Sequence, residues 1–336
     1  MVVGAEAVAR VERVAGRSLA ALVGPLGQLD DRLHPTAVPV GGGQLVLLGP
    51  GMYVNRGLAF GHGVEITDAD LETVEALSER VGVPAEVEVS PWAHPSLLAV
   101  AVRRGFQPSG FRTTLLRPVA REAVDRSDVV AVEEVCDDRG LAVWQEVAAT
   151  GFGYTTTEQR RVSDVYTTAV HRLGESRLYV GRIGSDAVAV AALTIREQVA
   201  ILGGMTTVPA ARGRGVQTDL IRVRLAAAAR GGCDIAMVTA APGSASERNL
   251  LRNGFSIAAT TLPSGCRPVP LGPVPSASGR PSQDRGHGRE ALRRDGGLRS
   301  RAAPSACPAR PPGGGSADCP RGSGRPGSGL RARPLP

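Results

Sequence analysis

The stretch from Val199 to Gly232 constrains the fold more than any other, because its pattern predicts a strand, a glycine-rich turn and a helix. The pair Gly203-Gly204 interrupts the apolar strand, which is typical of a bulge or of a close approach by other backbone. Beyond the turn at 212–215, apolar residues recur at helical spacing until Gly231-Gly232, where we expect the helix to end. These apolar positions are Val216, Leu220, Ile221, Leu225 and Ala228.

The turn itself has the properties of an anion site. Consecutive backbone amides that lead into a helix point at one spot, and the helix dipole adds partial positive charge there. Gly213 and Gly215 lack a Cβ, so a phosphate can approach the main chain, and Arg212 and Arg214 add charge. The sequence therefore predicts a cradle for a pyrophosphate group.

Two common phosphate-binding motifs fit this turn poorly. A P-loop requires a lysine, and the chain contains none. A dinucleotide fingerprint requires G-x-G-x-x-G and an acidic residue after the next strand. Here Thr218 stands at the third glycine position, and the strand expected at 235–238 leads into Thr239.

The run Arg212-Gly213-Arg214-Gly215-Val216 resembles the acetyl-CoA-binding motif R-x-x-G-x-G/A of the GCN5-related N-acetyltransferases, the GNAT superfamily. Gln217 stands where the family usually has its last Gly or Ala. The segment 233–255 resembles the strand, loop and helix that follow in the family, and it closes with Gly254-Phe255. The alternative is a plain βαβ unit whose glycine turn binds nothing.

The resemblance implies an enzyme that moves an acetyl group from acetyl-CoA to an amine of a small molecule or peptide, by direct attack on the thioester and without a metal. It also implies that a backbone N–H near Thr206–Val208, beside a splayed strand, stabilises the oxyanion. The residues expected to bind acetyl-CoA are Thr206, Thr207, Val208, Arg212, Gly213, Arg214, Gly215, Val216, Gln217, Thr218, Ser246 and Asn249. Ser244 fits a pantetheine contact or a helix cap.

The catalytic proton carrier is not evident from the sequence. Many family members place a Tyr four residues before the glycine of the closing Gly-Phe, and Leu250 stands there. The weak candidates lie on or between helices expected at 141–150 and 156–173, which would cover the acceptor site; they are Glu146, Tyr154, Glu158 and Tyr166. Because of Leu250 and Gln217, a catalytically silent acyl-CoA-binding or regulatory module is the alternative function.

The order of elements occurs twice along the chain. In each half a short apolar strand, a helix, a second strand and a second helix lead to Gly-Phe, at Gly105-Phe106 and Gly254-Phe255. We therefore expect an α/β (mixed-sheet) fold of two tandem GNAT-like acyl-CoA N-acyltransferase units, 1–118 and 127–262. In the first unit only Gly61-His62-Gly63 occupies the place of the turn, so we expect a degenerate unit without coenzyme A, with His62 in a turn or at the surface.

The positive charge of the chain is concentrated at its C-terminal end. The net charge is +7, and residues 263–336 contain thirteen Arg against four acidic residues. That segment is rich in Pro, Gly, Ser and Ala, which predicts a disordered tail or a GC-rich gene read out of frame. The remainder is mildly acidic, so nucleic acid is an unlikely partner.

Other classes of protein lack support in the sequence. The N-terminus carries charged residues before any long apolar run, and no run approaches the roughly 18 residues of a membrane span. The five cysteines include no C-x-x-C pair, which speaks against a zinc site or a disulfide framework. We expect a cytoplasmic protein; the acceptor and the oligomeric state do not follow from the sequence.

Overall fold

The computed structural model describes residues 4–120 and 130–266 of the 336-residue chain, and these form a mixed α/β structure. In the first half the elements are α1 (Ala5–Ala20), α2 (Val23–Leu29), the 3-10 helix η1 (Asp31–Leu33), β1 (Thr36–Val40), β2 (Gly43–Leu47), β3 (Arg56–Leu58), α3 (Asp68–Val81), β4 (Glu86–Val89), α4 (Ser96–Arg103), β5 (Gln107–Pro108) and β6 (Arg112–Pro118). In the second half they are β7 (Ala131–Glu134), α5 (Asp138–Phe152), α6 (Thr157–Leu173), β8 (Ser176–Ile183), β9 (Asp186–Arg196), β10 (Val199–Thr207), the 3-10 helix η2 (Pro209–Ala211), α7 (Val216–Arg230), β11 (Ile235–Ala240), α8 (Ala245–Arg252) and β12 (Ser256–Gly265). Residues 121–129, most of which lie between the two expected units, and residues 267–336, in the expected tail, lie outside the described ranges.

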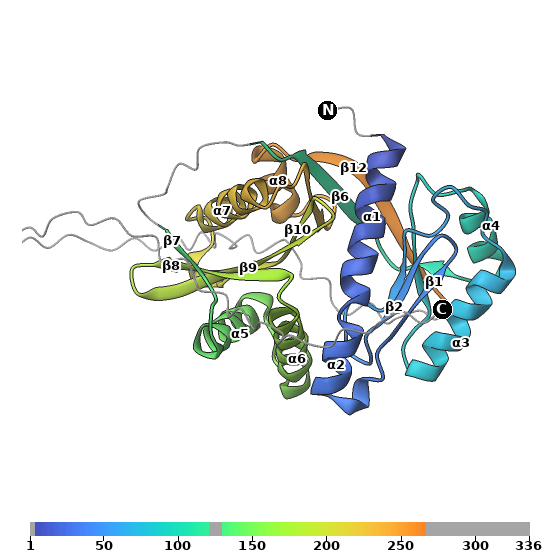
Figure 1. Ribbon diagram of the computed structural model, residues 1–336, viewed down its shortest axis with the longest axis horizontal. Helices are drawn as coiled ribbons and strands as arrows, with labels where there is room; N and C mark the ends of the chain where they lie inside the picture. Colours follow the sequence, from blue (N-terminus) through green and yellow to red (C-terminus); the bar gives the residue numbers. More distant parts are fainter. Residues whose placement is uncertain (1–3, 121–129, 267–336) are drawn as a thin grey trace, which may run out of the picture. The chain divides into compact units, whose positions relative to one another are not determined.

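The strands form one sheet in which the two halves exchange their last strands. The order is β1-β2-β3-β4-β12-β6-β11-β10-β9-β8-β7, with β5 beside β12. Strand β6 pairs antiparallel with β11 of the second half, and β12 pairs antiparallel with β4 of the first half (Figure 1). The halves therefore share backbone hydrogen bonds in the middle of the sheet, and their division into domains 1–118 and 127–262 stays a prediction.

The internal repeat is visible in the closing Gly-Phe pairs. Gly105 follows α4 with a φ of 76°, and Gly254 follows α8 with a φ of 78°. These left-handed conformations favour glycine at both positions. In each pair the phenylalanine is 3% exposed, and its amide donates to a carbonyl of the preceding helix, Phe106 to Ala101 and Phe255 to Leu250. The equivalence expected from the sequence therefore extends to the backbone geometry.

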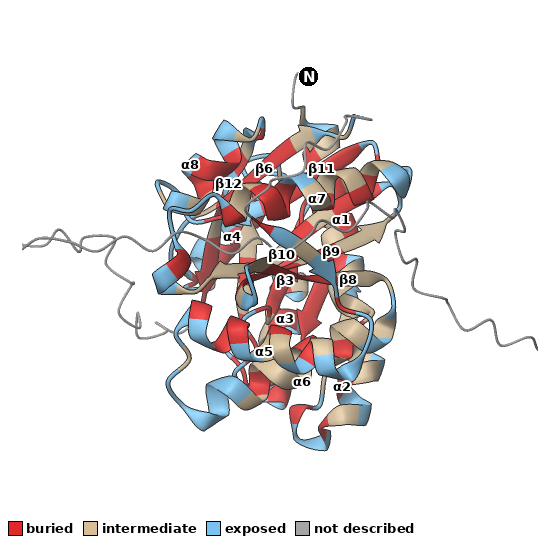
Figure 2. Cartoon of the chain, turned by 90° about the vertical axis from the view of Figure 1, so that its left-hand side faces the viewer, coloured by how far each residue is buried: buried red, intermediate tan, exposed pale blue. Residues whose placement is uncertain are grey.

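Helices cover both faces of the sheet. On β11, Ala236 and Val238 pack beneath α7 and α8, whereas Met237 packs beneath α1. On β9, Val190 packs against Trp144 of α5. Because neighbouring strand residues point to opposite faces, α7 and α8 cover one face, and α1 and α5 cover the other. Figure 1 shows α7 and α5 on opposite sides of β8 and β9, and Figure 2 shows buried residues gathered in the strands between the helices.

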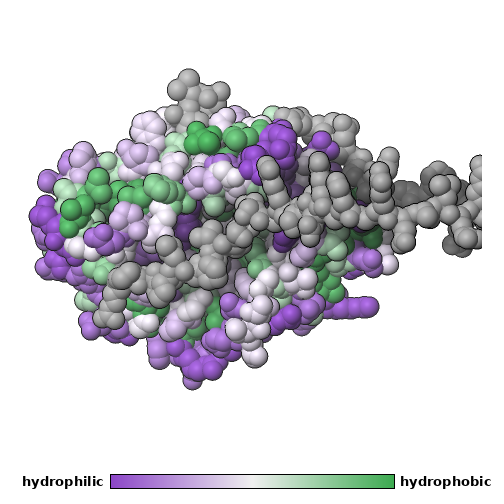
Figure 3. Space-filling model, turned by 180° about the vertical axis from the view of Figure 1, so that it is seen from behind, coloured by the Kyte–Doolittle hydropathy of each residue, from purple (hydrophilic) through white to green (hydrophobic). Residues whose placement is uncertain are grey.

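Large exposed apolar side chains are scattered over several elements. They include Tyr53, Phe111, Phe152 and Ile257. Seen from behind, apolar and polar side chains alternate across the described surface (Figure 3). Trp92 is also partly exposed, but its Nε1 donates to the Ala258 carbonyl at 3.1 Å, so this side chain ties the loop after β4 to β12. No helix in the two described ranges is both long and apolar enough to cross a membrane.

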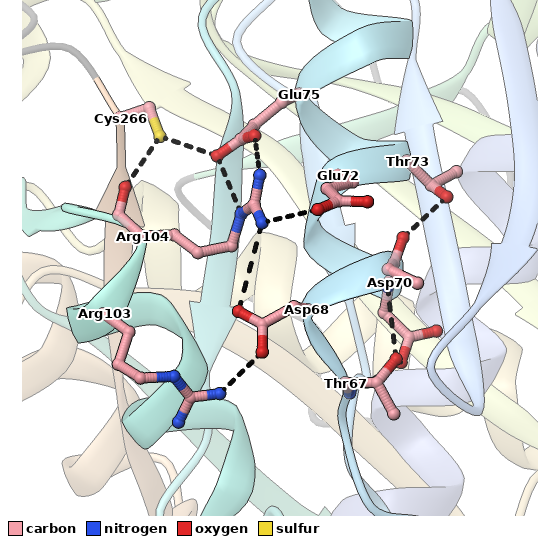
Figure 4. Close-up of polar contacts among 10 residues, drawn as sticks. Thr67, Asp68, Asp70, Glu72, Thr73, Glu75, Arg103, Arg104 and Cys266 are labelled. Atoms are coloured by element: carbon pink, nitrogen blue, oxygen red, sulfur yellow. Dashed lines mark hydrogen bonds and ion pairs between the residues drawn. The ribbon is translucent and has the colours of Figure 1, made fainter.

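Strand β12 continues to Gly265, past Pro263, where we expected the ordered chain to end. Ser264 and Gly265 pair with β4, and the Cys266 amide donates to the Ala85 carbonyl at 3.1 Å. The Cys266 Sγ contacts the carboxylate of Glu75 at 3.2 Å, and that carboxylate also binds Arg104 (Figure 4). Burial raises the pKa of the Cys266 thiol to about 11, so it stays protonated at neutral pH. Residues 263–266 are therefore part of the folded structure.

A chain that ends at Cys266 should keep the free energy of unfolding of the full chain, whereas one that ends at Leu262 should lose about 2 kcal/mol or more. The shorter chain lacks the pairing with β4 and the hydrogen bonds of Pro263 and Cys266 with Ser109 and Ala85, each worth about 1 kcal/mol. Urea unfolding of the three chains measures the difference. Equal stability of the two truncated chains would show that the end of β12 contributes nothing.

Candidate functional site

The predicted phosphate turn lies between β10 and α7. Gly213 and Gly215 have φ values of 77° and 82°, in the left-handed region that favours glycine. Nothing lies within 4 Å of where a Cβ would stand on either residue. No side chain caps the N-terminus of α7, so its first amides stay available to an anion in front of the helix.

The equivalent helix of the first half is closed to an anion. Thr67 caps α3, its hydroxyl accepts from the Asp70 amide, and the Asp70 carboxylate accepts from the Thr67 amide (Figure 4). Asp68 adds a second carboxylate in the first turn. The Gly61 amide in the preceding turn donates to the Gly41 carbonyl at 2.9 Å. The backbone amides that a phosphate would bind are therefore occupied, and the carboxylates of Asp68 and Asp70 would repel it.

The two arginines of the turn differ in their surroundings. Arg212 donates to the Thr207 carbonyl and to the Gly151 carbonyl, both at 3.1 Å, so its guanidinium ties the turn to the ends of β10 and α5. Arg214 is exposed, and its positive charge lies beside the uncapped helix end. Arg212 therefore shapes the turn, while Arg214 adds charge at its surface.

Three of the predicted residues meet between α7 and α8. The side-chain amide nitrogen of Asn249 donates to Gln217 Oε1 at 3.0 Å, and the Thr218 hydroxyl contacts Asn249 Oδ1 at 3.4 Å. Gln217, the departure from the family motif, thus has a buried partner. The Val216 side chain is buried in the core, which leaves only its backbone for a ligand. Ser246 lies in the first turn of α8, and Ser244 caps that helix through the Glu247 amide.

Strands β10 and β11 separate at the level of the glycine pair. Their parallel pairing ends at Ile201 and Met237, although β10 runs on to Thr207 and β11 to Ala240. The register of β10 against β9 also shifts between Gly203 and Thr206, as expected for a bulge. Beyond these residues the two strands are not paired with each other, and we call the space between them the gap.

The residues expected to bind the acyl group line this gap unequally. The Val208 amide donates to the Val188 carbonyl at 2.9 Å, so it is not available to an oxyanion. Successive amides of a strand point to opposite edges, so the Thr207 amide points toward the gap. The Thr206 side chain packs so closely on α5 that a Cβ on Gly151 would lie 2.5 Å from its methyl group.

A buried arginine of α7 holds the bulge in place. Arg224 is 0% exposed, and it donates to the carbonyls of Ala192 and Gly203 at 3.1 and 3.4 Å. Its other terminal nitrogen lies 2.8 Å from the Met205 sulfur. Burial lowers the pKa of Arg224 to about 9, which still leaves it charged at neutral pH. The guanidinium therefore ties α7 to β9 and β10 at the start of the bulge.

A cavity of about 210 Å³ lies on the opposite side of the gap from α7. Gly203 and Gly204 of β10 and Thr239 of β11 line one end of it. The remaining walls come from both halves of the chain, including α1, β3, β4, β6, α5 and α6. A ligand bound at the turn and a second molecule in the cavity would therefore meet at the gap.

An acid–histidine pair lies at the wall of this cavity. Glu12 of α1 lines the cavity, and its Oε2 is 2.6 Å from His62 Nε2. Glu12 and His62 are 7% and 5% exposed, so His62 lies in a turn, one of the two expected places, and not at the surface. Ser90 contacts the other carboxylate oxygen at 3.4 Å. The partners are 50 residues apart, and no local motif links them.

The weak catalytic candidates lie elsewhere. Glu146 pairs with Arg160 and Glu158 with Arg161, and both carboxylates are about two-thirds exposed. Tyr154 stacks on Phe152, and burial raises the pKa of its hydroxyl. None of the three lines the cavity, whereas Tyr166 does. Within residues 4–120 and 130–266, no group of three or more His, Cys, Asp or Glu side chains could hold a metal ion.

Solved structures share this architecture, although no protein-family model and no curated sequence matches the chain. A GCN5-related N-acetyltransferase from Kribbella flavida aligns with a TM-score of 0.53 at 20% identity, over 75% of this chain and 95% of that one. A tandem GNAT protein from the clavulanic acid biosynthesis pathway aligns with a TM-score of 0.50 at 14% identity, over 77% and 96%. These likenesses confirm the predicted fold: the chain has the fold of the GCN5-related N-acetyltransferases, in a tandem arrangement.

Proposed function

We propose that the protein is an N-acetyltransferase that uses acetyl-CoA and one site in its second half. The observation that carries the proposal is the separation of β10 from β11 beyond Ile201, with the uncapped end of α7 on one face of the sheet and a cavity on the other. This arrangement allows a thioester and an amine to meet between the strands while each is held by a different part of the chain. Holding two reactants in this way lowers the entropic part of the barrier.

The second half supplies the groups that acetyl-CoA requires. The first amides of α7 and the charge of Arg214 would hold the pyrophosphate at Gly213–Gly215. The edge of β10 beyond Ile201 is not paired with β11, so it can hydrogen-bond to the pantetheine arm. The Thr207 amide is the best-placed donor for the carbonyl oxygen of the acetyl group.

The cavity supplies a proton acceptor. Glu12 takes the proton that the acceptor amine loses as its nitrogen bonds to the acetyl carbon and the carbon–sulfur bond breaks. His62 orients this carboxylate and can share the proton at 2.6 Å. Leu250 is fully buried and has no ionisable group, so the departing thiolate takes its proton from water.

The rival function is a silent acyl-CoA-binding or regulatory module, which the absence of a tyrosine at Leu250 favours. Release of free thiol from acetyl-CoA with a broad panel of amines separates the two functions. Turnover with any amine supports the transferase. Tight binding of acetyl-CoA without turnover on the whole panel supports the silent module.

Replacing both Gly213 and Gly215 by Val should weaken binding of coenzyme A at least tenfold, which equals about 1.4 kcal/mol. The added side chains would occupy the open space in front of α7 and strain the left-handed backbone. Gly63→Val is the matched control, because Gly63 has a φ of 79°, open surroundings and a place in the turn of the first half. Calorimetry measures the affinity. Unchanged binding in a folded double variant would show that coenzyme A does not bind at this turn.

Coenzyme A should bind with a stoichiometry of one per chain. The capping box of Thr67 and Asp70 occupies amides at the start of α3, the helix equivalent to α7, and Asp68 repels a phosphate there. Isothermal titration counts the sites directly. Two equivalent sites per chain would show that the first half also binds the ligand.

The variant Glu12→Gln should lower kcat about 100-fold or more while the KM for acetyl-CoA stays unchanged, because general-base catalysis contributes at least that factor. Glutamine keeps the shape of the side chain but cannot accept the proton. Glu6→Gln, on the exposed part of α1, is the control. A kcat within twofold of the wild type would exclude Glu12 as the base.

A further inference from the structure

Two arginines share one carboxylate at the wall of the cavity. The Nε atoms of Arg56 and Arg112 each lie 3.0 Å from the same oxygen, Glu88 Oε1. The Arg56 and Glu88 side chains are only 6% and 11% exposed, and all three residues line the cavity. Burial lowers the pKa of Arg112, although its side chain remains 28% exposed. Charges held away from water in this way need partners of opposite sign.

The cluster keeps hydrogen-bond donors that its own residues do not use. The contact between Arg56 Nε and Glu88 lacks hydrogen-bond geometry, so this buried donor has no partner within the described part of the chain. Arg56 donates through one terminal nitrogen to the Tyr53 carbonyl at 2.8 Å. Arg112 contacts Glu88 only through Nε, which leaves its two terminal nitrogens to a ligand. The buried hydroxyl of Ser18, also at the cavity wall, has no partner in the described ranges either.

The charge balance favours a single negative charge in the ligand. Glu86 lies on the same side of β4 as Glu88, two residues away, and it does not line the cavity. Burial raises the pKa of Glu86, and both arginines oppose that shift. At this wall of the cavity two guanidinium groups thus face one carboxylate, Glu88, which leaves one positive charge. A carboxylate fits this balance better than a phosphate dianion, and its planar shape suits the fork of an arginine.

The cluster lies close to the gap in the sheet. Thr114 of β6 is opposite Thr239 of β11, the residue that lines the end of the cavity at the gap. Arg112 precedes Thr114 by two residues on the same face, which corresponds to about 7 Å along the strand. Apolar side chains line other parts of the cavity; they include Leu19, Val54, Leu58, Val170 and Leu178.

We propose that the acceptor is a small amine with a carboxylate and an apolar body, as in an apolar amino acid, and that Arg56 and Arg112 bind the carboxylate. This inference rests on the proposed transferase function, since it assigns the acceptor of the same site. The carboxylate lies at the arginine pair, the amine on the adjacent carbon points to the gap, and the apolar side chain fills the rest of the cavity.

The test compares ligands that differ only in the carboxylate. N-acetyl-L-leucine and N-acetyl-L-phenylalanine, as products, are titrated into the full chain beside their neutral amides. The acids should bind at least tenfold more tightly than the amides. Equal affinity of acid and amide, or no binding of either, would overturn the proposal.

Variants of the arginine pair make the test specific. Arg112→Met should reduce the affinity for the acids to that for the amides. Arg112→Lys should retain part of the preference, because lysine keeps the charge but lacks the bidentate hydrogen-bonding geometry of the guanidinium. Arg103→Met is the control, since Arg103 is exposed and pairs with Asp68 away from the cavity. A thermal midpoint near that of the wild type shows that each variant is folded, and an unchanged preference in folded Arg112→Met would also overturn the proposal.

Thiol release distinguishes this inference from the proposed function. If isopentylamine, which lacks a carboxylate, is acetylated as fast as L-leucine, the transferase function stands and the proposed carboxylate requirement is wrong. If the acids bind preferentially but no thiol is released from acetyl-CoA with L-leucine or any other amine, the carboxylate site stands and the transferase function is wrong.

Discussion

The backbone pairing of β6 with β12 is the interaction on which the site depends. Each strand is the last of its half, and each continues the sheet of the other half through β11 or β4. This pairing places β4, with Glu88, on the same surface as β11, with Thr239. Glu12 and Arg56 of the first half consequently share one cavity with Gly203 and Gly204 of the second. The half that lacks a phosphate turn therefore still contributes to the proposed chemistry.

The bulge in β10 lies beside the gap and is contacted by one buried side chain of α7. Arg224 donates to the carbonyls of Ala192 on β9 and Gly203 on β10. A buried acceptor left without a donor costs about 1–3 kcal/mol, so losing this side chain would be costly. Because the N-terminus of the same helix follows the glycine turn, α7 connects the turn with the bulge.

The sequence predicts the parts of this structure that depend on neighbouring residues. The turn, the bulge and the start of α7 follow from glycines within one short stretch, because left-handed backbone and open amides are local properties. The strand exchange does not follow, since β6 and β12 both carry Thr-Thr-Leu, at Thr113–Leu115 and Thr260–Leu262, and either could join either half. The pairs of the cavity could not be predicted either. Glu12 meets His62, and Arg56 meets Glu88, through folding alone.

The capped start of α3 bears on how such a duplicated chain can change over time. Thr67 and Asp70 give their helix a cap, and losing a cap of this kind costs about 1 kcal/mol. A mutation that reopened the first turn to phosphate would first lower stability, and the carboxylates of Asp68 and Asp70 would still repel the ligand. Several substitutions would therefore be needed to open this helix end to an anion. The asymmetry between the halves is thus self-reinforcing, because the side chains that stabilise the start of α3 also oppose an anion there.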